Sequence, residues 1–134
     1  MKMKKLISTL LPFFALGILG AGNAFAHAHL ESSDPAKDSV VRTMPTTVNL
    51  HFSEQLEISM SKLEVKNLDT GKVVSEGKPT YLRDDKSALQ IGIKDPTLSG
   101  EKTRFEVSWK AVSKDSHKMP GKYEFTFDPA PEKR

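Results

Sequence analysis

The sequence predicts an all-β fold, an antiparallel sandwich or small barrel. Two observations lead to this prediction. Apolar and polar residues alternate along several runs after residue 46, which is the pattern of strands that bury one face. Short segments rich in Asp, Pro and Gly separate these runs, as expected for strands joined by turns. Strands and turns at this spacing are typical of sandwiches and small barrels.

The individual elements follow in chain order. Five alternating runs are predicted strands, at 48–52, 63–65, 89–93, 105–111 and 123–127. We expect shorter strands near 30–32 and 72–74, which makes about seven in total. Predicted turns lie at 34–35, 44–45, 68–71, 84–85, 95–96, 99–100 and 120–121.

The first 26 residues resemble a cleaved signal peptide. A lysine-rich start precedes a mostly apolar run at 6–22, and Ala24-Phe25-Ala26 matches the small-x-small cleavage pattern. An uncleaved membrane anchor is the alternative, but the apolar run is short for a span. We therefore expect a signal peptide at 1–26, one β domain at 27–127 and a loose tail at 128–134, with the product exported.

Charge and cysteine content exclude several functions. The leader holds three lysines and no acid, so 17 of the 20 basic residues and all 17 acidic residues remain after it. The mature chain is formally neutral, which argues against a nucleic-acid-binding protein. The absence of Cys excludes disulfides, Cys-based zinc sites, thiol catalysis and a Cys-ligated blue-copper centre.

Cleavage after Ala26 exposes a histidine at the new N-terminus. His27 can chelate a metal through its α-amine and one imidazole nitrogen together. Nitrogen and carboxylate donors in tetragonal geometry suit Cu(II), which tops the divalent affinity order. Asp115 and His117 are two residues apart, so an extended backbone would direct both side chains to the same side. They could supply the remaining oxygen and nitrogen donors.

A second binding mode uses the same terminus. His29 is the third residue of the mature chain, and an X-X-His terminus can bind Cu(II) through the amine, two deprotonated amides and the third imidazole. This mode needs neither Asp115 nor His117. Both modes require deprotonated ligands, so the affinity should fall as the pH drops.

Other candidate residues receive weaker predictions. Met44, Met60 and Met119 are too far apart for a methionine-rich Cu(I) loop, so we interpret them as packing or surface residues. A weak Cu(I) site near Met119 stays open. Trp109 is predicted to lie in the core and His51 on an exposed strand face. Glu54 either is a surface acid or supports the metal site by hydrogen bonding or weak ligation.

Three features form a distinctive set: His27, the stretch Leu50-His51-Phe52-Ser53-Glu54, and the stretch W-x-A-V-S-x-D-x-H-x-x-x-G that runs from Trp109 to Gly121. In these features the chain resembles the CopC family of periplasmic copper-binding proteins. The opening His-Ala-His-Leu is especially similar to the YobA branch. The resemblance covers residues 27–127.

This resemblance implies a Greek-key barrel or sandwich of cupredoxin or immunoglobulin type. It implies one Cu(II) ion per chain, held by His27, Asp115 and His117, with Glu54 supporting the ligands. The protein would be a non-catalytic periplasmic copper carrier in homeostasis, transport or resistance. Its expected partner is a CopD-type inner-membrane copper transporter, and we expect a monomer.

The sequence favours two other functions less. A copper oxidoreductase with an N-terminal His is disfavoured, because one Trp and two Tyr offer no broad aromatic platform and a carboxylate beside copper crowds an open position. A secreted immunoglobulin-like interaction module without metal explains the strands but leaves His27, Asp115 and His117 as coincidence.

Overall fold

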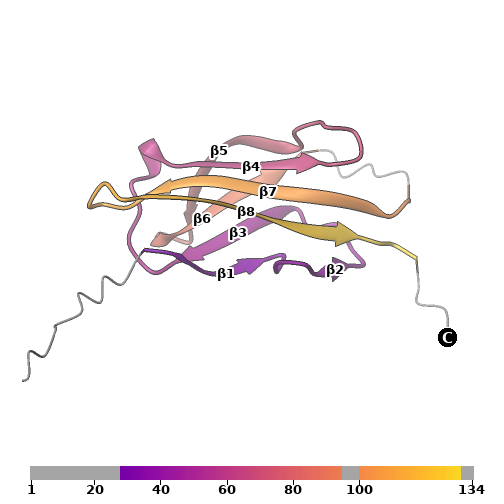
Figure 1. Cartoon of the computed structure of the whole chain (residues 1–134), viewed down its shortest axis with the longest axis horizontal. Coiled ribbons are helices and arrows are strands. Elements are labelled where there is room, and N and C mark those ends of the chain that lie inside the picture. The colour runs from indigo at the N-terminus through magenta and orange to yellow at the C-terminus, as the bar shows by residue number, and fades with distance from the viewer. Residues whose placement is uncertain (1–27, 95–99, 131–134) are drawn as a thin grey trace, which may run out of the picture.

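The computed structural model describes residues 28–94 and 100–130, which form a β-sandwich of two layers (Figure 1). The predicted signal peptide, His27 and the predicted turn at 95–96 lie outside these residues. The described strands are β1 (Leu30–Asp34), β2 (Val40–Val41), β3 (Thr47–Phe52), β4 (Lys62–Asn67), β5 (Ser75–Leu82), β6 (Asp85–Ile93), β7 (Thr103–Val112) and β8 (Lys118–Phe127). One short 3-10 helix, η1 (Ile58–Met60), precedes β4.

Each layer is a four-stranded sheet. One sheet has the order β1-β3-β6-β5 and the other the order β2-β8-β7-β4. All pairings are antiparallel except that of β2 with β8. The prediction of an all-β fold is confirmed, as a sandwich rather than a closed barrel, with one more strand than the expected seven.

The inner faces of the two sheets form one core. Buried and less buried residues alternate strictly along β3 and along most of β7, as the sequence pattern predicted. Phe105 and Phe125 stack across β7 and β8 with ring centroids 5.2 Å apart. Because neither ring is more than 1% exposed, this pair anchors the centre of the core.

Trp109 lies in the core, as predicted, and determines the residue opposite it. It is 9% exposed and contacts Phe52 and Tyr123 edge-on or tilted. Its partner across the sheet is Gly121. A Cβ added to Gly121 would lie 2.3 Å from the indole ring, so this position accepts only glycine without rearrangement. The predicted turn at 120–121 is therefore wrong: both residues lie within β8, and the glycine makes room for the tryptophan.

The predicted strand at 72–74 is also wrong. Only an isolated bridge joins Val73 to Lys66, and the strand β5 begins at Ser75. β5 is an edge strand with a register shift between Glu76 and Thr80 and with Gly77 at a φ of +71°. Its exposed, irregular residues carry no alternating pattern. The strand β2 was not predicted either, because its two residues are too few to show an alternating pattern.

The segments at the sandwich ends are held by specific contacts. Arg83 and Asp84 both have positive φ values and form the turn between β5 and β6, as in a two-residue hairpin. This turn lies one residue before the predicted 84–85, because Asp85 already belongs to β6. After β8, the Arg42 guanidinium donates to the carbonyl oxygens of Asp128 and Ala130 and lies 3.3 Å from the Asp128 carboxylate.

Candidate metal centre

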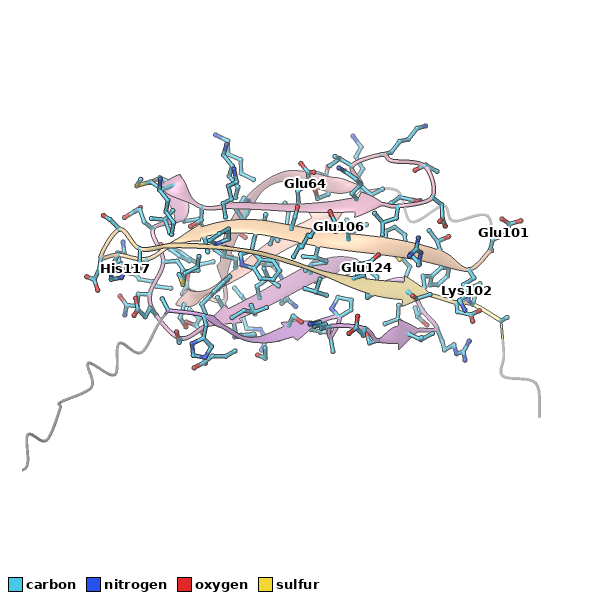
Figure 2. The ribbon with its side chains drawn as sticks, viewed as in Figure 1. Glu64, Glu101, Lys102, Glu106, His117 and Glu124 are labelled. Atoms are coloured by element: carbon cyan, nitrogen blue, oxygen red, sulfur yellow. The ribbon has the colours of Figure 1, made fainter. Side chains whose placement is uncertain are left out.

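Three potential metal ligands from two distant parts of the sequence meet at one end of the sandwich. The donor atoms of Glu54, Asp115 and His117 all lie within 4.8 Å of one another. Glu54 is half-buried, whereas Asp115 and His117 are exposed. Figure 2 shows His117 at the tip of the molecule, where the chain turns from β7 to β8. No other group of this kind occurs among residues 28–94 and 100–130.

The turn between β7 and β8 brings Asp115 and His117 together. Ser113 N–H donates to the carbonyl of His117 at 2.9 Å, and His117 N–H donates to the Ser113 hydroxyl at 3.1 Å. Ser116 adopts a φ of +68°, which reverses the chain. The expectation that an extended backbone aligns the two side chains is therefore wrong. They share a site because a turn closed by the buried Ser113 presents both.

The loop that carries Glu54 is anchored to this turn. Leu56 is fully buried and forms an isolated β-bridge with Ser113, and Lys114 N–H donates to the carbonyl of Gln55 at 2.9 Å. The Tyr81 hydroxyl donates to the Leu56 carbonyl at 2.7 Å. These contacts hold the Glu54 segment against the turn that carries Asp115 and His117, so the arrangement belongs to the fold and not to one flexible loop.

A salt bridge beside the site directs the positive charge of Lys114 away from Glu54, Asp115 and His117. The Lys114 ammonium lies 3.2 Å from the Glu57 carboxylate. Glu57 also accepts a hydrogen bond from the Ser59 hydroxyl. The bond from Ser59, followed by the bond and charge of Lys114, lowers the pKa of Glu57. Lys114 is thus directed toward Glu57, although it is the sequence neighbour of Asp115.

The beginning of the described chain lies beside the same site. His29 N–H donates to the Ser53 hydroxyl at 3.0 Å, and Ser53 N–H donates to the His29 carbonyl at 2.9 Å. Ala28 packs against the core. Ser53 directly precedes Glu54 in the chain. These contacts therefore extend the β1–β3 pairing up to the candidate metal ligand Glu54. Figure 1 shows that β1 starts at the end where β7 turns into β8.

The remaining predicted candidates lie elsewhere. His51 is on β3 opposite Ala88 and is half-buried, less exposed than expected. Met119 is 7% exposed and belongs to the core, and Met44 packs against that core. Met60 is 58% exposed. These exposures confirm the interpretation of the methionines as packing residues, for Met44 and Met119, or surface residues, for Met60.

Two residues that position the site were not predicted from the sequence. Ser53 and Ser113 use their hydroxyls to accept backbone N–H groups of His29 and His117. Both lie inside the segments that resemble the CopC family, but an isolated serine carries no pattern that assigns such a role. Their function depends on loop geometry, which a linear sequence does not display.

The donor set favours a transition metal over a hard cation. Glu54 and Asp115 supply carboxylate oxygens and His117 an imidazole nitrogen. Imidazole suits zinc, copper, iron and nickel, and a mixed nitrogen and oxygen set suits Cu(II) in tetragonal geometry. With only one nitrogen among the described ligands, a Cu(II) site of high affinity needs further nitrogen donors.

Comparison with known proteins adds the family to this geometry. A model of the CopC domain matches residues 30–128. The chain belongs to the CopC family. It is similar to copper resistance protein C of Xanthomonas campestris pv. juglandis, with 30% identity over 115 residues that cover 81% of this chain and 85% of that protein. It is also similar to protein YobA of Escherichia coli K12, with 29% identity over 117 residues and coverage of 84% and 91%.

A solved structure of the family has the same fold. The crystal structure of CopC from Methylosinus trichosporium OB3b matches with a TM-score of 0.66 and 28% identity, covering 81% of this chain and all of that one. The resemblance to the CopC family noted from the motifs is thereby confirmed. Over residues 28–94 and 100–130, no helix has the length and apolar character that crossing a membrane requires.

Proposed function

We propose that this protein is a non-catalytic, periplasmic carrier of Cu(II) and binds one ion per chain. The donors are the amine and imidazole of His27, the carboxylate of Asp115 and the imidazole of His117. Glu54 lies beside them as a hydrogen-bonding or weakly ligating acid. The clustering of Glu54, Asp115 and His117 within 4.8 Å carries this proposal.

Chain connectivity supports His27 as the source of the missing nitrogens. Consecutive Cα atoms are about 3.8 Å apart, and His27 is bonded to Ala28, which packs against the core. His29 is hydrogen-bonded to Ser53, the neighbour of Glu54. An amine and imidazole from His27, with His117 and Asp115, make three nitrogen donors and one oxygen, a set that suits Cu(II).

The contacts of His29 favour this mode over the X-X-His mode. The X-X-His mode uses the amide nitrogens of Ala28 and His29 as metal ligands. The His29 amide instead donates to the Ser53 hydroxyl at 3.0 Å, so the alternative mode would have to break a contact that joins β1 to the site. We therefore propose that copper binding depends on the fold.

Family membership supports the proposed role. Relatives carry the names copper resistance protein C and YobA, and we propose that this chain likewise serves copper homeostasis, transport or resistance. The carboxylates of Glu54 and Asp115 lie in the candidate ligand cluster, so a metal held there would keep few coordination positions open to a reacting oxygen species. This supports a carrier and not an oxidoreductase. A CopD-type inner-membrane transporter is the proposed receiver, and the protein is proposed to act as a monomer.

Competition titration of the exported protein with Cu(II) tests this proposal. One tight equivalent is expected, together with a His27 N-terminus in N-terminal sequencing. His117→Ala should weaken binding strongly, whereas His51→Ala, a control on β3 of the opposite sheet, should leave the affinity unchanged. Unchanged affinity in His117→Ala, with lost affinity in His29→Ala, would instead establish the X-X-His mode.

A further inference from the structure

Close to the β7–β8 turn, the outer face of β4, β7 and β8 carries a groove that the proposed copper site does not use. Its volume is about 320 Å³, and its lining is Met60, Lys62, Lys110, Ala111, Val112, Lys118 and Pro120. The lining thus combines three exposed lysines with an apolar floor and contains no acid. The groove adjoins the metal centre, because Lys118 directly follows His117 in the chain.

The strand register concentrates positive charge at this groove. Lys62 is directly opposite Lys110, Lys110 is opposite Pro120, and Lys118 is opposite Val112. Like charges directly opposite each other across strands are unfavourable. Within the described part of the chain, none of these three lysines has a salt-bridge partner. The groove therefore presents uncompensated cations that an external anion can neutralise.

The rest of the same sheet face differs in its charge. Glu64, Glu106 and Glu124 lie along the middle of the sheet, while His117 marks its end (Figure 2). Glu124 lies 3.7 Å from the Arg104 guanidinium, and Glu106 is opposite Lys66. Acids and bases alternate there, so the positive surface is confined to the end of the sheet that adjoins the metal centre.

Exposed apolar surface accompanies the charge. Met60, on η1, is 58% exposed and is one of three exposed large hydrophobic residues in the described chain. A flexible thioether adapts to different partner side chains. A second hollow of about 590 Å³ runs between η1, β4 and β5 and shares Lys62 with the groove. Lys62 thus stands between two adjoining depressions.

We propose that this lysine groove, defined by Met60, Lys62, Lys110, Lys118 and Pro120, docks an acidic segment of a partner protein that also inserts an apolar side chain. A concave apolar floor fits a side chain better than it fits a flat membrane surface. A second copy of the chain would bring the same positive charge to a two-fold contact. As a docking site for a copper donor or acceptor, the groove rests on the proposed function, because the partner would lie beside the ligands.

The test uses the metal-free protein and amide chemical-shift mapping by NMR. The probe is a short synthetic peptide that alternates glutamate with leucine, and the control peptide alternates lysine with leucine. Binding of the acidic peptide should shift residues around the groove and should weaken as salt is raised, since charges are screened beyond about 10 Å at 0.1 M. The absence of binding, or shifts on the opposite sheet, would overturn the proposal.

Charge-reversal variants locate the effect. Lys62→Glu, Lys110→Glu and Lys118→Glu together should weaken peptide binding about tenfold or more, equivalent to about 1.4 kcal/mol. The matched control changes Lys37, Lys72 and Lys94 to Glu, three exposed lysines away from the groove. An equal loss of peptide affinity in both variants would show that binding depends only on the net charge of the protein, which would contradict the proposal.

Further outcomes separate the other occupants and the proposed function. Tighter binding of the groove to vesicles of phosphatidylglycerol than to the peptide would assign it to a membrane. A dimer in light scattering, with concentration-dependent chemical-shift changes at the groove, would assign the groove to a second copy of the chain. Either result overturns the proposal. Cu(II) titration of the triple variant should still give one tight equivalent; failure of copper binding in wild type with retained peptide binding would refute only the proposed function.

Discussion

Ser113 shows how one side chain shapes the site without offering a strong metal ligand. It is 1% exposed, and its hydroxyl accepts the His117 N–H while its own N–H donates to the His117 carbonyl. These two bonds close the turn that presents Asp115 and His117. The D-x-H pair was identified from the sequence, but its geometry depends on this serine.

Ser113→Ala should therefore weaken copper binding without removing a ligand. Residues that orient metal ligands typically contribute about 10–100-fold to affinity, and we expect a loss in that range. Competition titration with Cu(II) provides the measurement. Ser59→Ala is the control, because the Ser59 hydroxyl contacts Glu57 and not the turn. Equal affinity of Ser113→Ala and wild type would show that the turn forms without the hydroxyl.

Tyr123 gives the fold a pH dependence. Its hydroxyl donates to the carbonyl of Pro35 at 2.7 Å, and burial raises its pKa from 10.0 to about 12. Folding therefore favours the neutral phenol. The corresponding stability is fully present below pH 10 and is lost as the pH rises through about 12.

Tyr123→Phe should remove this dependence and lower the stability at neutral pH. Leaving the buried Pro35 carbonyl without its donor costs about 1–3 kcal/mol. Denaturant unfolding of both proteins from pH 7 to pH 12 measures the effect, and the two stabilities should converge as the pH rises. A constant difference across this range would contradict the assignment of the pH dependence to Tyr123.

At the scale of elements, the strands with one buried face were predictable and the irregular ones were not. β3, β6, β7 and β8 alternate because one face packs against the opposite sheet, and period-two patterns report that packing. β5 is an exposed edge strand, so nothing in its burial imposes a pattern. Pro120-Gly121 has the composition of a turn, yet the tertiary contact with Trp109 determines its conformation.

The pairing of Trp109 with Gly121 leads to a prediction for β8. Gly121→Ala should destabilise the protein by about 1–3 kcal/mol, the usual range for overpacking a core, because the added methyl overlaps the indole ring. Thermal unfolding measures the change. Gly92→Ala is the control, since the nearest atom to its added Cβ is a Glu76 carboxylate oxygen at 4.0 Å. Similar melting temperatures for the two variants would contradict this account.

On the scale of the whole molecule, the sandwich brings together segments that are far apart in the chain. The start of β1, the loop after β3 and the β7–β8 turn meet at one end (Figure 1). The sequence motifs indicated the proposed metal ligands but not Glu54's distance from them, because that distance depends on the β-bridge between Leu56 and Ser113. The lysine groove depends on strand register in the same way.

The central claim is that one Cu(II) ion is held jointly by the N-terminal His27 and the β7–β8 turn. Spin-resonance spectroscopy of the copper-loaded, exported protein tests it most directly through the nitrogen hyperfine structure. The account predicts three nitrogen donors, a loss of one in His117→Ala, and a changed spectrum when one glycine is added before His27. A spectrum that neither change alters would contradict the claim.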